Sequence, residues 1–467
     1  MKHLAILGGG ITGLTAAFYI NKAIKEQGLP LKVSLLEASD RLGGKIKTIR
    51  KNGFIIEQGP DSFLERKTSA AQLVKDAGLE EELVRNRTGQ AYVLNDGRLY
   101  EIPKGTSMGI PTTMSAFTST DMFSRGAKFR TALDLVLPRS EREGDQSVGN
   151  FFKRRLGTET VERLIEPLLS GIYAGNLDKL SLRATFPQFY QMEQKKRSLM
   201  LGMRGNRSKE KTNSEKPQGK FLTLKNGLET LVDEIEKQLP PGTVNRNAAV
   251  QELVKSDDGY ELCLANGETV EADAVISTVP HSESQNFLPA YPFLQPMGGA
   301  EPTTVATVVM AFPADQVTLD HDGTGFVVSR TAGFTITACT WTHKKWPHTT
   351  PEDMVLLRCY VGKPGDEEIV EKSDEELIEI VLRDLKRVTD IEGEPGFVQI
   401  QRWRKAMPQY IVGHLQWLEN LREQTGIHLP GLFFAGASYE GVGLPDCIDQ
   451  GKKAAQEALQ FVAKVSE

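Results

Sequence analysis

The stretch "LAILGGGITGLTAAFY", which begins at Leu4, restricts the fold of this chain more than any other feature. A short apolar run, residues 4–7, has the length of a buried parallel strand and is too short for a helix. Gly8, Gly10 and Gly13 follow with the spacing G-x-G-x-x-G, and apolar residues at helical intervals come next. A strand, these glycines and a helix together predict the first βα unit of a dinucleotide-binding domain.

Each of these glycines has a physical role in such a unit. Gly8 permits the tight turn out of the strand, Gly10 lets a pyrophosphate approach the backbone, and Gly13 allows close packing of helix on strand. The helix N-terminus supplies unpaired N–H groups and partial positive charge for the anion. A second apolar run, residues 33–36, ends at Glu37, where a carboxylate can accept hydrogen bonds from ribose hydroxyls. An acid at this position disfavours a 2′-phosphate, so NADP is not expected.

A second pair of glycines favours FAD over NAD. In "EASDRLGGKIKT", Glu37 is followed by Arg41, Gly43, Gly44 and Lys45. Adjacent glycines let the backbone pass close to a bulky group, and Arg41 is expected to reach the diphosphate. The stretch resembles the pattern E-x-x-x-R-x-G-G-[KR] of the GG-doublet flavoproteins, which include amine oxidases, phytoene desaturases and porphyrinogen oxidases. The resemblance implies one non-covalently bound FAD per chain.

The end of the chain, "GLFFAGASYEGVGLPDCIDQGKKAAQEAL", repeats the order of strand, glycine-rich loop and helix. In the GG-doublet flavoproteins this unit holds the ribityl chain and the pyrimidine end of the flavin, with a helix N-terminus facing N1 and O2. Cys447 lies past the position of the cysteine that binds flavin covalently in some members. The resemblance assigns to FAD the residues Gly8, Gly9, Gly10, Ile11, Thr12, Gly13, Glu37, Ala38, Arg41, Gly43, Gly44, Lys45, Gly59, Pro60, Asp61, Ser62, Val250, Trp403, Gly436, Val442, Gly443 and Leu444.

The stretch "LIEPLLSGIYAGNLDKLSLRATFPQF", residues 164–189, indicates the branch of the superfamily. It resembles the signature of the protoporphyrinogen oxidases, and "GPDSFLERK", "ACTWTHKKWP" and "MPQYIVGH" resemble the Gram-positive coproporphyrinogen/protoporphyrinogen oxidases. The resemblance implies oxidation of coproporphyrinogen III, protoporphyrinogen IX or both to the porphyrin in heme biosynthesis, with O2 as acceptor and H2O2 as product. It also implies handover of the product to the next enzyme of the heme pathway. Two alternatives stay open: another amine oxidase or desaturase, and a non-catalytic binding protein on the same scaffold.

A porphyrinogen needs cations for its carboxylates and an apolar slot for its ring. The resemblance places Lys67 at the position of a propionate-binding base, with Arg66 as the next candidate, and makes Ile172 and Tyr173 the lining of the apolar side. The competing interpretation of Lys67 is a solvated lysine on a helix. No catalytic side chain is expected, because flavin N5 accepts the hydride.

Motifs for other chemistries are missing from the sequence. We find no G-x-S-x-G or H-E-x-x-H stretch, and a lone pair of histidines, His343 and His348, is more typical of structural residues than of a metal site. No metal is therefore predicted. The cysteines have no C-x-x-C pairing and predict buried thiols in a reducing compartment. They are Cys263, Cys339, Cys359 and Cys447.

The charge and hydropathy patterns restrict the partners of the chain. A formal net charge of −5 with both signs scattered gives no reason to expect nucleic acid. No apolar run of 18 residues occurs, and no signal peptide precedes the first strand, so a cytoplasmic protein is expected. Residues 108–138 mix apolar and basic residues; they suit either weak contact with a membrane surface or a core-packing helix with a basic face. We favour the second interpretation.

The order of these segments predicts an α/β plus α+β architecture. An FAD-binding Rossmann-like domain of the GG-doublet, glutathione-reductase type is expected to be discontinuous in sequence, with a mixed-sheet substrate domain and a helical subdomain that serves as a membrane-surface or substrate-entry region. A lysine- and serine-rich stretch with almost no apolar residues predicts a mobile loop. The expected bounds are 1–64, 218–285 and 403–467 for the FAD domain, 65–90 and 286–402 for the substrate domain, 91–203 for the helical subdomain and 204–217 for the loop.

Overall fold

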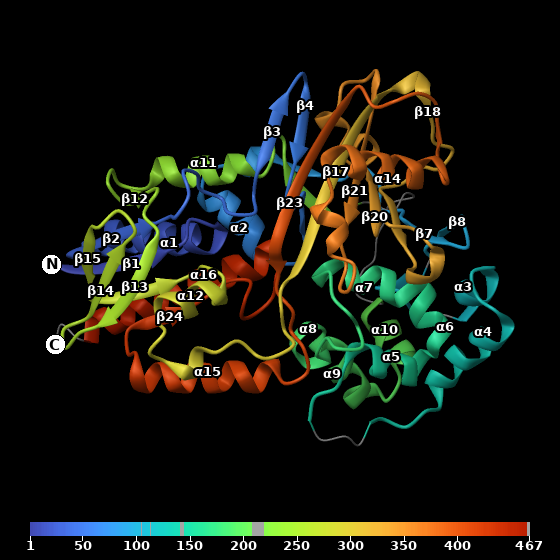
Figure 1. Ribbon diagram of the computed structural model, residues 1–467. Coiled ribbons are helices and arrows are strands. Elements are labelled where there is room, and N and C mark those ends of the chain that lie inside the picture. The colour runs from blue at the N-terminus through green and yellow to red at the C-terminus, as the bar shows by residue number, and fades with distance from the viewer. Residues whose placement is uncertain (104, 113, 141–143, 208–218, 465–467) are drawn as a thin grey trace. The chain divides into compact units, whose positions relative to one another are not determined.

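Two units, each assembled from segments that lie far apart in the sequence, make up the structure (Figure 1). The structure is a computed structural model that describes residues 1–103, 105–112, 114–140, 144–207 and 219–464. The first unit comprises Met1–Arg85, Lys220–Gly298 and Gln416–Glu467, and the second comprises Asn86–Gly219 and Gly299–Leu415.

A five-stranded parallel sheet forms the centre of the first unit. Its strands in spatial order are β12 (Val244–Asn245), β2 (Leu31–Leu36), β1 (Lys2–Leu7), β16 (Ala274–Ser277) and β24 (Leu432–Phe434). Alternate residues of β1 enter two different cores: Leu4 and Ile6 pack on one face, and Ala5 and Leu7 on the other. Because both faces are covered, the buried part of the strand, residues 4–7, is apolar, as the sequence predicted.

Helices cover both faces of this sheet. On one face, α1 (Ile11–Gln27) packs along α16 (Leu444–Lys464), and α2 (Thr68–Asp76) and α11 (Glu229–Gln238) complete the layer. Most of α15 (His414–His428), α12 (His281–Phe287) and the antiparallel strands β13 (Val250–Lys255), β14 (Tyr260–Leu264) and β15 (Thr269–Ala272) share the other core. Two smaller sheets belong to this unit: β3 (Thr48–Lys51) with β4 (Phe54–Glu57), and β5 (Phe63–Leu64), β11 (Phe221–Leu224) and β6 (Leu83–Arg85).

A seven-stranded mixed sheet dominates the second unit. Its spatial order is β23 (Phe397–Met407), β17 (Thr303–Pro313), β21 (Met354–Val361), β20 (Ala338–Trp341), β19 (Gly325–Val328), β7 (Tyr92–Asn95) and β8 (Arg98–Glu101). The pair β19–β7 is parallel and the others are antiparallel. One face packs on α14 (Asp374–Lys386), which begins with a capping box formed by Ser373 and Glu376. Short elements of this unit are β9 (Thr106–Ser107), β10 (Ile110–Pro111), β18 (Val317–Thr318), β22 (Asp390–Ile391) and α13 (Thr342–Lys345).

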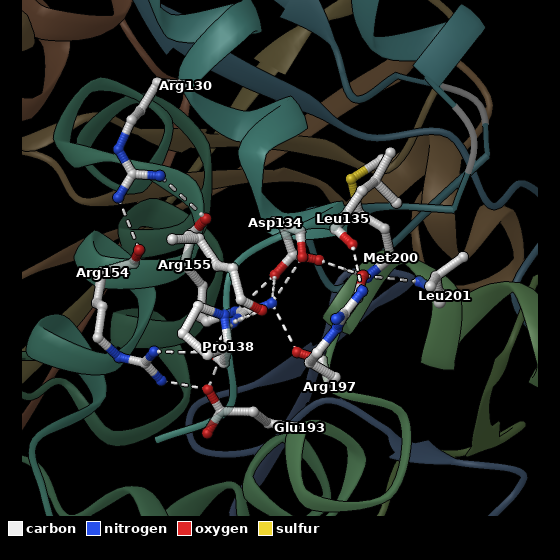
Figure 2. A network of polar contacts seen from close by, with 12 residues as sticks. Arg130, Asp134, Leu135, Pro138, Arg154, Arg155, Glu193, Arg197, Met200 and Leu201 are labelled. Atoms are coloured by element: carbon white, nitrogen blue, oxygen red, sulfur yellow. Dashed lines mark hydrogen bonds and ion pairs between the residues drawn. The ribbon is translucent and has the colours of Figure 1, made fainter. Parts of the chain in front are cut away.

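The second unit also contains a group of helices, several of which contribute to a buried network of charges (Figure 2). They are α3 (Met114–Ser119), α4 (Arg125–Ala132), α5 (Val148–Leu156), α6 (Thr158–Thr160), a π-helical turn (Val161–Ile165), α7 (Glu166–Tyr173), α8 (Leu182–Thr185), α9 (Pro187–Lys196) and α10 (Leu199–Arg207). Arg155 of α5 donates to Asp134 Oδ1 at 2.6 Å, and Ser198 Oγ donates to Asp134 Oδ2 at 2.6 Å. Arg154 pairs with Glu193 of α9. The network therefore joins three stretches that are separate in the sequence: the turn with Asp134, the end of α5, and residues 193–198.

Residues 108–138 contribute to a core of this unit. Phe117, Met122, Phe123 and Ala127 pack together there, as expected for helices that bury an apolar face, whereas Phe129 is 70% exposed. Over the residues that the structure describes, no helix is both long and apolar enough to cross a membrane.

The unit boundaries differ from the expected domains. Residues 65–85 belong to the first unit, because α2 joins the core of α1 and β6 pairs with β11. Residues 286–298 also lie in the first unit, whereas 403–415 lie in the second, because β23 continues along β17 as far as Met407. The expected helical subdomain shares a unit with the mixed sheet, since Val93 of β7 and Phe117 of α3 belong to one buried core. Of the expected loop, 204–207 complete α10 and 208–217 lie outside the described residues.

Candidate cofactor-binding site

The turn from β1 into α1 has the geometry of an anion site. Gly8 has φ of +98°, a conformation that favours glycine, and a Cβ at Gly13 would lie 2.0 Å from the Gly8 carbonyl oxygen. No described side chain caps α1 at Gly10, and its first turn holds no acid, which leaves N–H groups for a ligand. A Cβ at Gly10 would meet no atom of the described chain within 4 Å. Open space therefore lies beside the uncapped helix end.

The second glycine pair lies against this turn. The Gly43 N–H donates to the Gly9 carbonyl at 2.8 Å, and a Cβ at Gly44 would lie 3.2 Å from the Gly10 Cα. Both Gly43 and Gly44 have positive φ, at 97° and 56°. A side chain at Gly44 would push against the first loop, and one at Gly43 would meet the Ile46 carbonyl of its own loop, so glycine at both positions allows this close approach.

Arg41 braces the second loop from within. Its guanidinium donates to the carbonyls of Gly44, at 2.8 Å, and of Ile46, and it lies 3.8 Å from Glu229. These contacts hold the Gly43–Gly44 turn in shape, a role that sequence analysis did not predict. Contact of Arg41 with the diphosphate stays a prediction.

Glu37 connects the first glycine loop to the end of β2. Its Oε2 accepts the Gly9 N–H at 2.6 Å, and its Oε1 accepts the Ser39 N–H and hydroxyl at 2.8 and 2.7 Å. A carboxylate has about four acceptor positions, so a ribose hydroxyl has a place left to bind. The Ala248 N–H donates to the Glu37 carbonyl at 2.9 Å, which brings the start of β13, and hence Val250, to the same corner. Ala38, next to Glu37, is exposed.

The first and last segments of the chain meet at the start of α1. A Cβ at Gly436 would lie 3.5 Å from the Thr12 hydroxyl, and a Cβ at Gly451 would lie 2.4 Å from the Thr12 carbonyl. The loop from Gly436, which contains Val442 and Gly443, leads into α16 at Leu444. The predicted convergence of the two chain ends is therefore present within the first unit.

At this corner the protein shifts the pKa values of two side chains toward their neutral forms. Burial raises the pKa of the Cys447 thiol to about 11, and its Sγ lies 3.9 Å from the Gly441 carbonyl. A thiol that stays protonated at neutral pH is a poor nucleophile. The Lys45 side chain is accessible, yet the protein around it lowers the pKa of its ammonium through desolvation.

Lys67 is paired with a carboxylate of the chain itself. It precedes α2, and its Nζ donates to Asp446 Oδ1 at 2.5 Å and Oδ2 at 2.7 Å. The ion pair joins the 59–67 segment to the first turn of α16, which the acid at this helix end also stabilises. Within the segment, Ser62 donates to Asp61 at 2.7 Å. Arg66, the second candidate cation, is exposed.

Three predicted site residues belong to the second unit. Ile172 is 42% exposed, whereas Tyr173 is 5% exposed, with its ring 5.8 Å from Phe186 and 5.5 Å from Tyr410. The Tyr173 ring therefore packs in an aromatic cluster. Trp403 is half-buried on β23 opposite Val305. The assignment of these residues to substrate or flavin stays a prediction.

The surroundings of His343, His348 and the cysteines indicate structural roles for these side chains. Burial lowers the pKa of both His343 and His348, and His343 contacts the Leu356 carbonyl at 3.3 Å. Within the described part of the chain, no group of three or more His, Cys, Asp or Glu could hold a metal ion. The four cysteines are free; Cys263 is half-buried and the other three are buried.

Sequence analysis missed two residues at the start of α16, Asp446 and Gln450. Asp446 holds Lys67, and Gln450 hydrogen-bonds the glycine-rich loop. An acid in the first turn of a predicted helix is a signal that could have drawn attention to Asp446. No local pattern distinguishes Gln450, because its partners in the glycine-rich loop, Gly436 and Glu440, lie 14 and 10 residues away.

The geometry of this corner fits a flavin dinucleotide. It combines an uncapped helix N-terminus beside open space, two glycine loops in backbone contact and a carboxylate at the end of β2. These are the donors, the close approach and the acceptor that a pyrophosphate and an adenosine ribose require.

Comparison with known proteins agrees with this class of site. Residues 11–459 match the family model of flavin containing amine oxidoreductases, and the chain belongs to that family. Within the family it is similar to the coproporphyrinogen III oxidases of Bacillus subtilis, at 55% identity over 99% of this chain and 98% of the relative, and of Staphylococcus aureus, at 43% over 98% and 99%. A crystal structure from Exiguobacterium sp., provisionally assigned as a protoporphyrinogen oxidase, superposes with a TM-score of 0.87 at 41% identity and covers 98% of this chain and 99% of that one.

Proposed function

We propose that this protein oxidises coproporphyrinogen III to coproporphyrin III in heme biosynthesis, with one non-covalently bound FAD per chain and O2 as the electron acceptor. The observation that carries the proposal is the 55% identity to a coproporphyrinogen III oxidase over nearly the whole of both chains. The two glycine loops and Glu37 support the proposal, because a scaffold without flavin would not need these features together.

The reaction balances as one porphyrinogen and three O2 giving one porphyrin and three H2O2. Bound FAD would supply a two-electron acceptor that O2 can reoxidise, so three turnovers are needed for each porphyrin. The chain binds and orients the two reactants. The N-terminus of α1 and the backbone of Gly10 would hold the pyrophosphate, and Glu37 the adenosine ribose.

The proposed reaction needs few protein groups that transfer protons. The methylene bridge that is oxidised has C–H bonds activated by two pyrroles, and the pyrrole N–H protons can leave to solvent, so positioning dominates. The buried Cys447 thiol stays protonated, because burial raises its pKa to about 11. This supports non-covalent binding of the cofactor.

A substrate with four propionates needs cations around its rim. Lys67 is our candidate, and its pairing with Asp446 changes what the lysine can do. An ammonium has three N–H donors, of which Asp446 accepts two, so one remains for a substrate carboxylate. We therefore propose that Lys67 binds a propionate while Asp446 orients it.

A second candidate is protoporphyrinogen oxidation, which the Exiguobacterium structure favours. Parallel steady-state assays on coproporphyrinogen III and protoporphyrinogen IX, followed by porphyrin fluorescence, compare the two. We expect a higher kcat/KM for coproporphyrinogen III. A preference for protoporphyrinogen IX would change the assigned substrate. A colourless protein that takes up no added FAD would refute the proposal that the chain is a flavin-dependent enzyme.

A further inference from the structure

One amide side chain joins the two ends of the glycine-rich loop that follows β24. Gln450 lies in the second turn of α16 and is 8% exposed. Its Oε1 accepts the Gly436 N–H at 3.0 Å, and its Nε2 donates to the Glu440 carbonyl. The same nitrogen lies 3.3 Å from the Asp446 carbonyl. The loop from residue 436 to 440 is therefore closed by a single carboxamide.

Two glycines allow the backbone of this loop to follow its course. Gly436 has φ of +116° and Gly441 has φ of +79°, conformations that glycine adopts readily and other residues rarely do. Inside the loop, the Tyr439 N–H donates to the Gly436 carbonyl at 3.0 Å. Without Gln450, the Gly436 N–H and the Glu440 carbonyl would both lose a buried partner.

At neutral pH an amide can satisfy both ends at once. The oxygen must face an N–H, and the nitrogen must face carbonyl oxygens, which fixes the orientation of the Gln450 side chain. A glutamate here could accept from Gly436 but would set a carboxylate against the carbonyls of Glu440 and Asp446. A methionine could serve neither end.

A second contact from the same helix supports the loop. The Asp446 side chain lies where a Cβ at Gly441 or Gly443 would come within 2.7 or 2.8 Å of it, and its carboxylate also holds Lys67. Asp446 and Gln450 are four residues apart and so lie on one face of α16. The first two turns of this helix thus determine the course of residues 436–443.

We propose that Gln450 is a positioning residue for the cofactor, which keeps the 436–443 loop and the N-terminus of α16 in the conformation that receives the flavin. The inference rests on the proposed binding of FAD. It does not depend on which substrate is oxidised. Gln450 acts through the loop backbone and not by its own contact with the flavin.

The test compares Gln450→Met with Gln456→Met, a control at an exposed position of the same helix. We expect FAD to bind Gln450→Met about tenfold more weakly than wild type in titrations of the FAD-free chain, as when one or two neutral hydrogen bonds are lost. The melting temperature should fall more with saturating FAD than without it, and KM for the porphyrinogen at saturating FAD should stay unchanged. The control should match wild type in all three measurements.

An unchanged affinity for FAD in Gln450→Met would overturn the inference. So would equal falls in melting temperature with and without FAD, which would make the role purely structural. If Gln450→Met fails to fold, Gln450→Glu replaces it: its affinity for FAD relative to wild type should rise as pH falls, because a protonated carboxyl can donate to Glu440. A flat ratio across pH would refute the proposal. Wild-type protein that binds FAD but oxidises neither porphyrinogen would instead refute the proposed function and leave this inference standing.

Discussion

Removal of Arg155 should destabilise the second unit more than any surface change, because its guanidinium is fully buried among acceptors (Figure 2). It donates to Asp134 Oδ1 at 2.6 Å, to the carbonyls of Asp134 and Arg197 at 2.7 Å each, and to the Pro138 carbonyl at 3.0 Å. Arg155→Met keeps an unbranched apolar stem in place of the arginine stem and removes every one of these donors. The substitution leaves the Asp134 carboxylate buried with less compensation.

The size of the loss in stability depends on the partners that the Asp134 carboxylate keeps. Asp134 keeps the Ser198 hydroxyl and the Met200 N–H, at 2.6 and 3.0 Å, so its charge is partly stabilised. Breaking a buried ion pair by removing one partner costs about 3–5 kcal/mol. For a unit of about 250 residues, each kcal/mol lowers the melting temperature by about 2–4 °C, so we expect a fall of about 6–20 °C.

Thermal unfolding followed by circular dichroism measures this effect. Arg404→Met is the matched control, because Arg404 pairs with Glu371 on the surface with 61% of its side chain exposed, and it should melt close to wild type. In Arg155→Met/Asp134→Leu the uncompensated carboxylate is gone, so part of the lost stability should return. A melting temperature of Arg155→Met equal to that of the control would refute the reasoning.

The remaining predictions concern the cofactor and the substrate. Glu37→Ala should weaken FAD binding by about 1.5–3 kcal/mol, since a charge-assisted contact is lost; Glu37→Gln, which keeps an acceptor for the Gly9 N–H, should lose less, and equal affinity of Glu37→Ala and wild type would contradict the ribose assignment. Lys67→Ala should raise KM for coproporphyrinogen about tenfold with little change in kcat; an unchanged KM at low salt would contradict the propionate contact. Denaturation should release all FAD into the supernatant, because the Cys447 thiol is protonated below its pKa of about 11; flavin retained on the chain would disprove non-covalent binding. Oxygen uptake should be about three O2 per porphyrin; one O2 per product would indicate a single desaturation.

Local sequence patterns determined the core of the nucleotide-binding unit. The apolar run at residues 4–7, the spacing of Gly8, Gly10 and Gly13, and the carboxylate of Glu37 at the end of the next strand each act over a few residues. Such patterns can be recognised because the physics behind them is local: strand period, helix period and the conformational freedom of glycine. The strand, loop and helix at the chain end were predictable for the same reason.

Only the tertiary structure decided which side chains far apart in the sequence form ion pairs and hydrogen bonds with one another. Lys67 and Asp446 are 379 residues apart, and Gln450 turns inward because α16 packs beside the loop. Arg41 follows the expected motif, yet it binds carbonyls of its own loop, and the boundary at residues 65–85 follows from the core that α2 joins. A sequence displays which groups can donate or accept, but which donor meets which acceptor depends on strand order and helix packing, which are set by burial over the whole unit.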